Sequence, residues 1–185
     1  PIYDVWNVCV WKESVFFRSS SRIFEYKANK VSVYRPSSHW RFLGKSSDKL
    51  IAQDFDKGLL YFENGQWIPF CTDLQLLGKQ LVTSIVPISK ELSLISTFEN
   101  GLYWLNTQRV QAFATSFITE ISKYRIYHAV QINATQIALS TSLNGCYIID
   151  IHGNFIQHFS KTEGLNNNNI LSSFLDKQKN LWLGL

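Results

Sequence analysis

Four short segments rich in aromatic and aliphatic residues recur along this chain, at intervals of roughly 40 residues. Three begin with glycine, which lets a chain turn sharply into a strand because it has no Cβ to clash. The first begins with Arg22 instead, and so matches the others less well. A repeat of this length is typical of the blades of a β-propeller. The segments are Arg22–Tyr26, Gly58–Phe62, Gly101–Leu105 and Gly145–Ile149.

Further apolar runs surround each segment and predict four strands in every repeat. A short polar turn follows each segment, and a run that ends in an aromatic residue follows the turn. Two more apolar runs come before the segment. Asn and Gly in the turns tolerate the backbone of tight hairpins, which predicts antiparallel neighbours. In the third repeat the four runs are Val82–Ile88, Leu92–Ile95, Gly101–Leu105 and Val110–Phe113.

The sequence therefore predicts an all-β fold, a β-propeller fragment of about four four-stranded antiparallel blades plus the start of a fifth. A β-sandwich is the alternative, but the constant order of runs within each repeat favours blades. Four blades and part of a fifth do not close a ring. We therefore expect a piece of a larger propeller of about seven blades, or pairing of the open edges with a second copy. The predicted blades are residues 1–36, 37–74, 75–120 and 121–165, with the start of the next at 166–185.

The composition argues against several other classes of protein. The net charge of +4 is spread along the chain without a basic cluster, which disfavours direct contact with nucleic acid. No apolar run reaches the roughly 18 residues of a membrane helix. Cys9, Cys71 and Cys146 form no CxxC pair, and we expect Cys9 and Cys146 to be buried free thiols. The chain lacks an initiating Met and stops inside an apolar run, so both ends are expected to be cuts.

The C-terminal segment carries the most specific pattern. Gly164-Leu165 and Asn168 are followed by Asp176 and then by Asn180-Leu181-Trp182-Leu183-Gly184. This series resembles the two-component regulator propeller repeat, which reads roughly G-L-x-x-N-x-V and then D-x-x-G-N-L-W-[IL]-G-T. Lys179 replaces the turn glycine of that pattern, and Leu185 replaces its threonine. Weaker echoes of the pattern occur earlier, at Thr97–Leu102 and Thr141–Cys146.

The resemblance implies the periplasmic sensor part of an inner-membrane signal-transduction or transcription regulator, without catalysis or a cofactor in the propeller itself. In this family the propeller is usually followed by a triple-tyrosine β-domain, a membrane helix, and a histidine kinase or helix-turn-helix output module. The implied partners are a small-molecule or oligosaccharide ligand and the missing blades and triple-tyrosine β-domain of the same chain. A homodimer is a further option. Trp182 and Leu165 are expected to pack between blades, and Gly184 to allow a close approach.

Ligand-binding residues are expected on one face of the propeller. The loops that lead into each first strand, and those that join the second and third strands, share that face, and loops on a rigid scaffold concentrate binding residues. Aromatic rings stack on sugars, and guanidinium groups hold carboxylates or sulfates. For Trp40 a place in the blade core is the competing interpretation. The candidate residues are His39, Trp40, Arg41, Asp54, Asp56, Glu99, Arg125 and His128.

Catalytic and metal sites are not indicated by these residues. Asp54 and Asp56 offer fewer oxygen ligands than a metal loop needs, so a solvated turn is the simpler interpretation. Glycoside hydrolysis needs two carboxylates that flank one bond, and Glu99 in the matching loop of the next blade could approach Asp54 or Asp56. No two of the four histidines have the spacing of metal ligands. We therefore expect no catalytic residue and no metal site.

Three functions are compatible with the sequence. The first is a ligand-binding sensor segment that transmits occupancy to a partner domain, which requires the ligand to bind two conformations unequally. The second is a platform for protein–protein interaction, and a large exposed apolar patch on the loop face would favour it. The third is a carbohydrate-active propeller enzyme. The sensor is the interpretation that the repeat motif favours.

Overall fold

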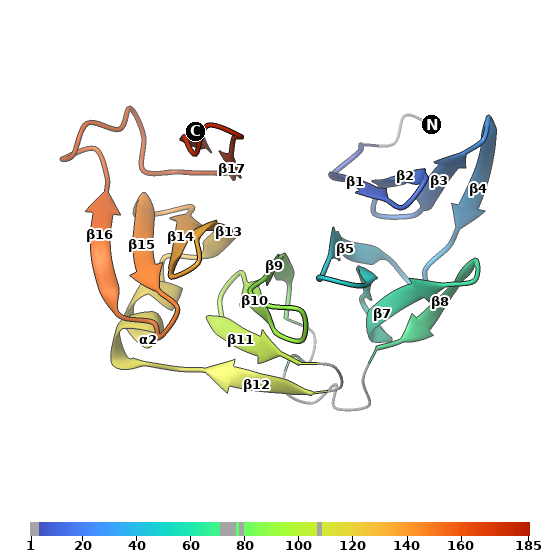
Figure 1. Ribbon diagram of the computed structural model, residues 1–185, viewed down its shortest axis with the longest axis horizontal. Helices are drawn as coiled ribbons and strands as arrows, with labels where there is room; N and C mark the ends of the chain where they lie inside the picture. Colours follow the sequence, from blue (N-terminus) through green and yellow to red (C-terminus); the bar gives the residue numbers. More distant parts are fainter. Residues whose placement is uncertain (1–3, 71–76, 78–79, 107–108) are drawn as a thin grey trace. The chain divides into compact units, whose positions relative to one another are not determined.

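The computed structural model describes residues 4–70, 77, 80–106 and 109–185 (Figure 1). The chain divides into two compact units, residues 1–79 and 80–185, and each is described by itself. Cys71, and part of the loop predicted between the second and third blades, lie outside the described residues.

The first unit contains two four-stranded sheets, which we call blades 1 and 2. Each is a meander in which every strand pairs antiparallel with the next along the chain. Blade 1 consists of β1 (Asn7–Trp11), β2 (Ser14–Arg18), β3 (Ile23–Lys27) and β4 (Lys30–Tyr34). Blade 2 consists of β5 (Trp40–Lys45), β6 (Leu50–Asp54), β7 (Gly58–Glu63) and β8 (Gln66–Pro69).

The second unit contains two more meanders, blades 3 and 4, a two-stranded sheet and a short helix. Blade 3 consists of β9 (Val82–Pro87), β10 (Ser93–Thr97), β11 (Leu102–Leu105) and β12 (Val110–Phe113). Blade 4 consists of β13 (Ile126–Asn133), β14 (Gln136–Thr141), β15 (Cys146–Asp150) and β16 (Phe155–Phe159). The helix is α2 (Ser116–Ser122), and the last sheet pairs β17 (Ser172–Leu175) with β18 (Leu181–Gly184).

This arrangement confirms the predicted fold class. The four repeated segments become the third strands of four separate sheets, as a propeller requires and a single continuous sheet would not allow. Within each unit the first strands of successive sheets lie side by side: β1 with β5, β9 with β13, and β13 with β17. The innermost strands of neighbouring propeller blades meet in this way.

The turn into the third strand shows why glycine recurs there. Gly58, Gly101 and Gly145 have positive φ values of 76°, 81° and 73°, which side chains with a Cβ rarely adopt. In blade 1 the connection is one residue shorter, and the Ser19 backbone N–H donates directly to the Arg22 carbonyl at 2.8 Å. None of residues 19–22 has a positive φ. Arg22 is therefore tolerated because this tighter turn does not need the left-handed conformation.

The first unit is held together by aromatic side chains between blades 1 and 2. Phe16 and Ile23 of blade 1 pack with Trp40, Leu43 and Leu60 of blade 2, and all are buried. Three further partly buried rings complete this joint, with centroid separations of 5.0 to 6.3 Å: Tyr34, Phe62 and Trp67.

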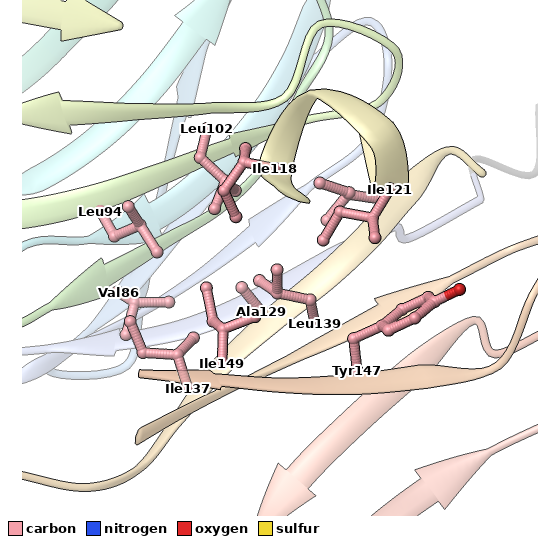
Figure 2. Packing of buried hydrophobic residues seen from close by; sticks show 11 residues of the cluster. Val86, Leu94, Leu102, Ile118, Ile121, Ala129, Ile137, Leu139, Tyr147 and Ile149 are labelled. Atoms are coloured by element: carbon pink, nitrogen blue, oxygen red, sulfur yellow. The ribbon is translucent and has the colours of Figure 1, made fainter. Parts of the chain in front are cut away.

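In the second unit the joint between blades 3 and 4 is mostly aliphatic, and α2 covers it (Figure 2). Ile118 and Ile121 point from the helix toward the buried side chains of both blades. Thr115 caps the helix by accepting a hydrogen bond from the Ile118 N–H at 3.1 Å. This segment was expected to be a loop. Its cap and its apolar residues three and four positions apart, Phe117, Ile118 and Ile121, were the available helix signals.

The last sheet packs on blade 4 through one face only. Leu165, Ile170, Leu181 and Leu183 cluster with the buried Cys146 and Ile148 of blade 4, which confirms the expected packing of Leu165. Trp182 lies on the opposite face and is 60% exposed, so its expected packing between blades is wrong for this chain. Its indole N–H donates to Asp176 Oδ2 at 2.8 Å instead.

Two smaller expectations concern Gly184 and the cysteines. A Cβ on Gly184 would lie 2.2 Å from the Ser172 hydroxyl oxygen, so this glycine does permit a close approach, from a side chain of the paired strand.

Cys9 and Cys146 are free thiols. Cys146 is buried, as expected, but Cys9 is only half-buried. Burial raises the pKa of the Cys146 thiol to about 12, which keeps it protonated and unreactive.

Candidate ligand-binding face

A β-bulge recurs in the first strand of blades 2, 3 and 4, close to the loop that leads into each strand. In these strands the pairing register shifts around Arg41, Thr83 and Tyr127. A bulge leaves one residue outside the regular ladder and re-aims its side chain, and bulges are common beside functional sites. The bulged residues therefore mark the end of each blade at which the sequence predicts ligand binding.

In the first unit the bulged residue belongs to a stack built on Phe55. The Arg41 guanidinium lies 4.5 Å from the centre of the Phe55 ring, and the His39 ring stacks on Phe55 at 4.6 Å with an interplanar angle of 17°. The Phe55 backbone N–H donates to the His39 carbonyl at 3.0 Å, which fixes the loop beneath the stack. Arg41 Nε is buried and makes no hydrogen bond to any described residue. The stack thus brings a cation and an imidazole onto the same aromatic ring.

Asp54 stabilises the same loop from below. Its side chain is buried and accepts hydrogen bonds from the backbone N–H groups of Ser37, Asp56 and Lys57 at 2.7, 2.9 and 3.1 Å, and from the Ser37 hydroxyl. Burial by itself raises the pKa of this carboxyl, but the hydrogen bonds outweigh it, and the pKa lies below its usual value. Asp54 is therefore an ionised anchor of the loop, while the Asp56 side chain is exposed above it.

Trp40, the residue between His39 and Arg41, points the other way. It is 2% exposed, packs in the joint of blades 1 and 2, and donates its indole N–H to the Tyr34 carbonyl at 3.3 Å. The structure therefore gives Trp40 the packing role that was its competing interpretation.

A broad groove of about 550 Å³ lies next to this loop in the first unit. Aromatic rings of Tyr34, Trp40 and Trp67 line part of it, together with the cationic side chains of Arg35 and Lys57. Arg35 and Lys57 form no ion pair with any described residue. Rings beside free cations suit a ligand that has both apolar sugar faces and acidic groups.

In the second unit a related group surrounds Phe98. The Arg125 guanidinium lies 5.5 Å from the centre of the Phe98 ring and pairs with Glu99 at 3.6 Å between Nε and Oε1. Tyr127, the bulged residue of blade 4, also contacts Phe98, with the two ring centres 6.0 Å apart in an edge-on geometry. Both charged side chains are well exposed, so the ion pair itself contributes little stability.

His128 faces the joint between blade 4 and the last sheet. Its Nδ1 lies 2.8 Å from the Ser173 hydroxyl of β17, and burial lowers the pKa of the imidazole below its usual value. A neutral His128 is therefore part of the packing between these two sheets.

The eight candidate residues thus separate by position. His39, Arg41 and Asp56 in the first unit, and Glu99 and Arg125 in the second, lie at the loop face, whereas Trp40, Asp54 and His128 support the packing beneath it. Ligand binding by any of them stays a prediction. The sequence reasoning missed Phe55, Phe98 and Tyr127. The signal for the first two was an aromatic residue directly after the second strand in consecutive repeats.

Meandering four-stranded sheets with adjacent first strands define this chain as a β-propeller segment, and solved structures of the same fold support this. The extracellular domain of BT4673 from B. thetaiotaomicron, assigned to a one-component or hybrid two-component system, matches with a TM-score of 0.75 at 16% identity. The match covers 98% of this chain and 26% of that one. The extracellular domain of BT3049, from a hybrid two-component system of the same organism, matches with 0.70 at 19% identity, covering 98% and 25%.

A more distant neighbour is the WD40 propeller domain of Doa1, with a TM-score of 0.68, 12% identity, and coverage of 95% of this chain and 60% of that one. These structural matches, all below 20% identity, establish the fold alone. The two extracellular domains come from two-component systems, the class of regulator whose propeller repeat the motif of residues 164–184 resembles. The chain spans about a quarter of the length of those domains. No family model and no curated protein matches the sequence.

No described helix is long and apolar enough to cross a membrane. Within the same residues, no three His, Cys, Asp or Glu side chains come together as a set of metal ligands.

Proposed function

We propose that this chain is a non-catalytic, ligand-sensing propeller segment of the periplasmic part of a transmembrane signal-transduction regulator. The observation that carries the proposal is the stack of Arg41 and His39 on Phe55 at the loop end of blade 2. The groove that Arg35 and Lys57 line adds further cationic side chains in the same unit. The extracellular domains of two-component systems that share the fold support the cellular setting. Further blades, a triple-tyrosine β-domain, a membrane helix and an output module would belong to the longer protein.

The chemistry of the loop face favours an oligosaccharide as the ligand, and an acidic one in particular. Sugar rings stack on exposed aromatic faces, and a guanidinium or ammonium group holds a carboxylate or sulfate substituent. The Arg41 guanidinium forms no ion pair with a described residue, so an acidic group of a ligand would not have to displace an existing carboxylate. Asp54, by contrast, has its oxygens engaged by the loop, which disfavours a role as acid or base in glycoside cleavage.

Calorimetric titration of the chain with neutral and acidic oligosaccharides tests the proposal. We expect binding of an acidic sugar, at least a tenfold weaker affinity in Arg41→Ala, and unchanged affinity in Arg109→Ala. Arg109 is the matched control because it precedes β12, away from the loops discussed above. Chromatography of the same mixtures should show no cleavage products. Cleavage would overturn the non-catalytic assignment. Failure of every sugar to bind would overturn the sensor proposal and favour a protein-interaction platform.

A further inference from the structure

A pocket of about 310 Å³ opens in the first unit, at the end of the blades opposite to His39 and Phe55. The turns β1–β2, β5–β6 and β7–β8 contribute to its lining, whereas His39 and Phe55 belong to the loops β4–β5 and β6–β7. The rings of Trp11 and Phe62, which pack in the joint between blades 1 and 2, form part of its wall. Its volume is within the range of small-molecule sites. We call it the Glu25 pocket, after the half-buried carboxylate that lines it.

Glu25 occupies a position that is apolar in blades 3 and 4. Its cross-strand partner is the buried Phe16, so its side chain is on the face of blade 1 that packs on blade 2. Its equivalents are Trp104 and Ile148, because all three are two residues after the first paired residue of a third strand. Trp104 packs in the joint of blades 3 and 4, and Ile148 in the joint of blade 4 with the last sheet. In blade 1 a charge therefore replaces an apolar residue within a joint, and such local exceptions are expected at functional sites.

Two hydroxyl groups of blade 1 hold this carboxylate in place. Ser14 Oγ donates a hydrogen bond to Glu25 Oε1 at 2.7 Å, and Tyr34 Oη donates one to Glu25 Oε2 at 2.6 Å. Burial, together with the hydrogen bond to Glu25, raises the pKa of Tyr34, which keeps its phenol protonated as a donor. Each carboxylate oxygen has two lone pairs, so both oxygens can accept a further hydrogen bond from a ligand in the pocket.

The charges around the pocket leave Glu25 without a cationic partner. It forms no ion pair with any residue that the structure describes. Lys12 lies over the Trp11 ring instead, with Nζ 5.9 Å from the ring centre. A carboxylate and aromatic rings in one pocket suit a cation with an apolar body, which gains both an ion pair and contact with the rings. Two further lysines of the wall already pair with carboxylates, at 3.4 and 3.8 Å: Lys27 with Glu13, and Lys49 with Asp48.

We propose that the Glu25 pocket binds a small organic cation, with its ammonium group on the Glu25 carboxylate and its apolar body against Trp11 and Phe62. This site is separate from the loop face and does not depend on the function proposed above. Trp11 and Glu25 belong to β1 and β3 of blade 1, and Phe62 belongs to β7 of blade 2, so the ligand contacts both blades. Ligand binding therefore stabilises the joint between them. Simple amines and amino acids share the required ammonium group, and the experiment separates these two sources.

Titration of the ¹⁵N-labelled chain with phenethylamine, phenylalanine and 2-phenylethanol, followed by two-dimensional NMR, tests this site. We expect phenethylamine, which carries an ammonium group at neutral pH, to shift the signals of the Trp11 indole and of the backbone at Ser14, Glu25 and Gly65. 2-Phenylethanol has the same ring without the charge and should bind about tenfold more weakly. Phenylalanine adds a carboxylate. Tighter binding than that of phenethylamine would assign the site to amino acids, with Lys12 as the carboxylate partner, and weaker binding would assign it to simple amines.

Two substitutions test the assigned contacts. Glu25→Gln should lower the affinity for phenethylamine by about tenfold, because it removes the charge and nearly keeps the shape of the side chain. Trp11→Leu keeps an apolar contact but removes the aromatic ring, and it should lower the affinity by about threefold. Glu91→Gln is the matched control, because Glu91 is exposed in the turn between β9 and β10 of blade 3, outside the pocket, and this variant should bind normally.

Circular dichroism of each variant checks that it is folded, and Trp11→Leu tests the site by itself if Glu25→Gln does not fold. No shift of the named signals at about 10 mM phenethylamine would overturn the proposal, since a weaker affinity does not define a specific site. Equal binding of phenethylamine by the unmodified chain and by a folded Glu25→Gln variant would also overturn it. So would equal binding of phenethylamine and 2-phenylethanol.

Discussion

The joint between blades 1 and 2 and the joint between blades 3 and 4 use equivalent positions but different chemistry. The first is mainly aromatic, with Phe16 and Trp40 at its centre. The second is mainly aliphatic, with Leu94 and Ile137 at its centre, and it has the additional cover of α2. Residue type can therefore vary widely at these positions, provided that an apolar side chain fills them.

In both joints a backbone carbonyl at the β-bulge needs a hydrogen-bond donor, and a different kind of side chain supplies it in each. The bulge at the start of the first strand disturbs the ladder and requires a partner for a backbone carbonyl. In the first unit the buried Arg18 donates Nη1–H to the Trp40 carbonyl at 2.9 Å. In the second unit the Thr83 hydroxyl donates to the equivalent carbonyl of Ile126 at 3.0 Å, and Ser96 lies 2.8 Å from Thr83. The backbone geometry sets the requirement, and either a guanidinium or a hydroxyl meets it.

The largest expected effect is a difference in the loss of stability when two glycines with similar backbone angles are replaced by alanine. Gly145 in the second unit and Gly65 in the first have φ values of 73° and 78°. A Cβ on Gly145 would lie 2.0 Å from the Phe159 carbonyl oxygen, whereas a Cβ on Gly65 meets no atom within 4 Å. Gly145→Ala should lower the free energy of unfolding by about 4 kcal/mol and Gly65→Ala by about 1 kcal/mol. Urea denaturation measures both, and equal losses would contradict this account.

The next effect concerns α2, the helix that covers the second joint. Ile118 is 2% exposed and packs between α2 and both blades. Ile118→Ala should lower the free energy of unfolding by about 3 kcal/mol, because it removes buried methyl groups and leaves a cavity. Glu120→Ala on the exposed side of the helix is the control and should change stability by less than about 0.5 kcal/mol. A small loss in Ile118→Ala would show that α2 does not stabilise the joint.

The third prediction compares the two ways of satisfying the carbonyl. Arg18→Met keeps most of the side-chain volume but removes the donors to the Trp40 carbonyl and to Asn7 Oδ1. It should lower the free energy of unfolding by about 2–3 kcal/mol, since buried acceptors lose their partners. Ser96→Ala leaves the hydrogen bond from Thr83 to the Ile126 carbonyl in place, and it should lower the free energy of unfolding by only about 1 kcal/mol. The reverse order in denaturation experiments would refute the assigned roles.

The smallest effect is a difference in the acid sensitivity of the two units. The folded-state pKa of His128 is lowered, so below about pH 6.5 the unfolded state binds the proton first and the second unit loses stability as the pH falls. The lowered pKa of Asp54 gives the first unit a stabilisation that is lost only below about pH 4. Hydrogen exchange at pH 7.5 and 5.5 should show earlier loosening around His128.

His128→Gln provides the control for this pH effect. Glutamine retains a group that can hydrogen-bond to Ser173 but does not titrate, so the variant should lose the difference between pH 7.5 and 5.5. A pH dependence that survives the substitution would assign it to another group.

Much of the fold was predictable because it follows from local rules. Apolar runs separated by turn residues specified the strands, and the Asn64-Gly65 pair adopts the positive φ values of a tight hairpin. The pattern from Asp176 to Trp182 is also local: the Asp176 carboxylate accepts from the Asn180 side chain at 2.9 Å and from the Trp182 indole at 2.8 Å. Lys179 at the turn glycine position adopts a φ of 68°.

The candidate site was less predictable, because it depends on contacts between loops. The sequence placed His39 and Arg41 at the entry to the first strand of blade 2, but it could not reveal that both lie against Phe55. It also could not distinguish the exposed Asp56 from the buried Asp54, two positions away, whose carboxylate is engaged by three backbone N–H groups. A β-bulge likewise leaves no clear mark in one sequence, since it is a mismatch between two strands.

The amino-acid sequence by itself determined the repeat, the four-stranded units and the turns between strands, because side-chain periodicity and backbone preference act over a few residues. Only the tertiary structure decided which faces are covered. Phe16 and Trp182 occupy equivalent positions, yet Phe16 is fully buried under blade 2 and Trp182 is exposed. Whether a side chain is buried depends on which sheet packs against it, and the identity of the residue does not determine that.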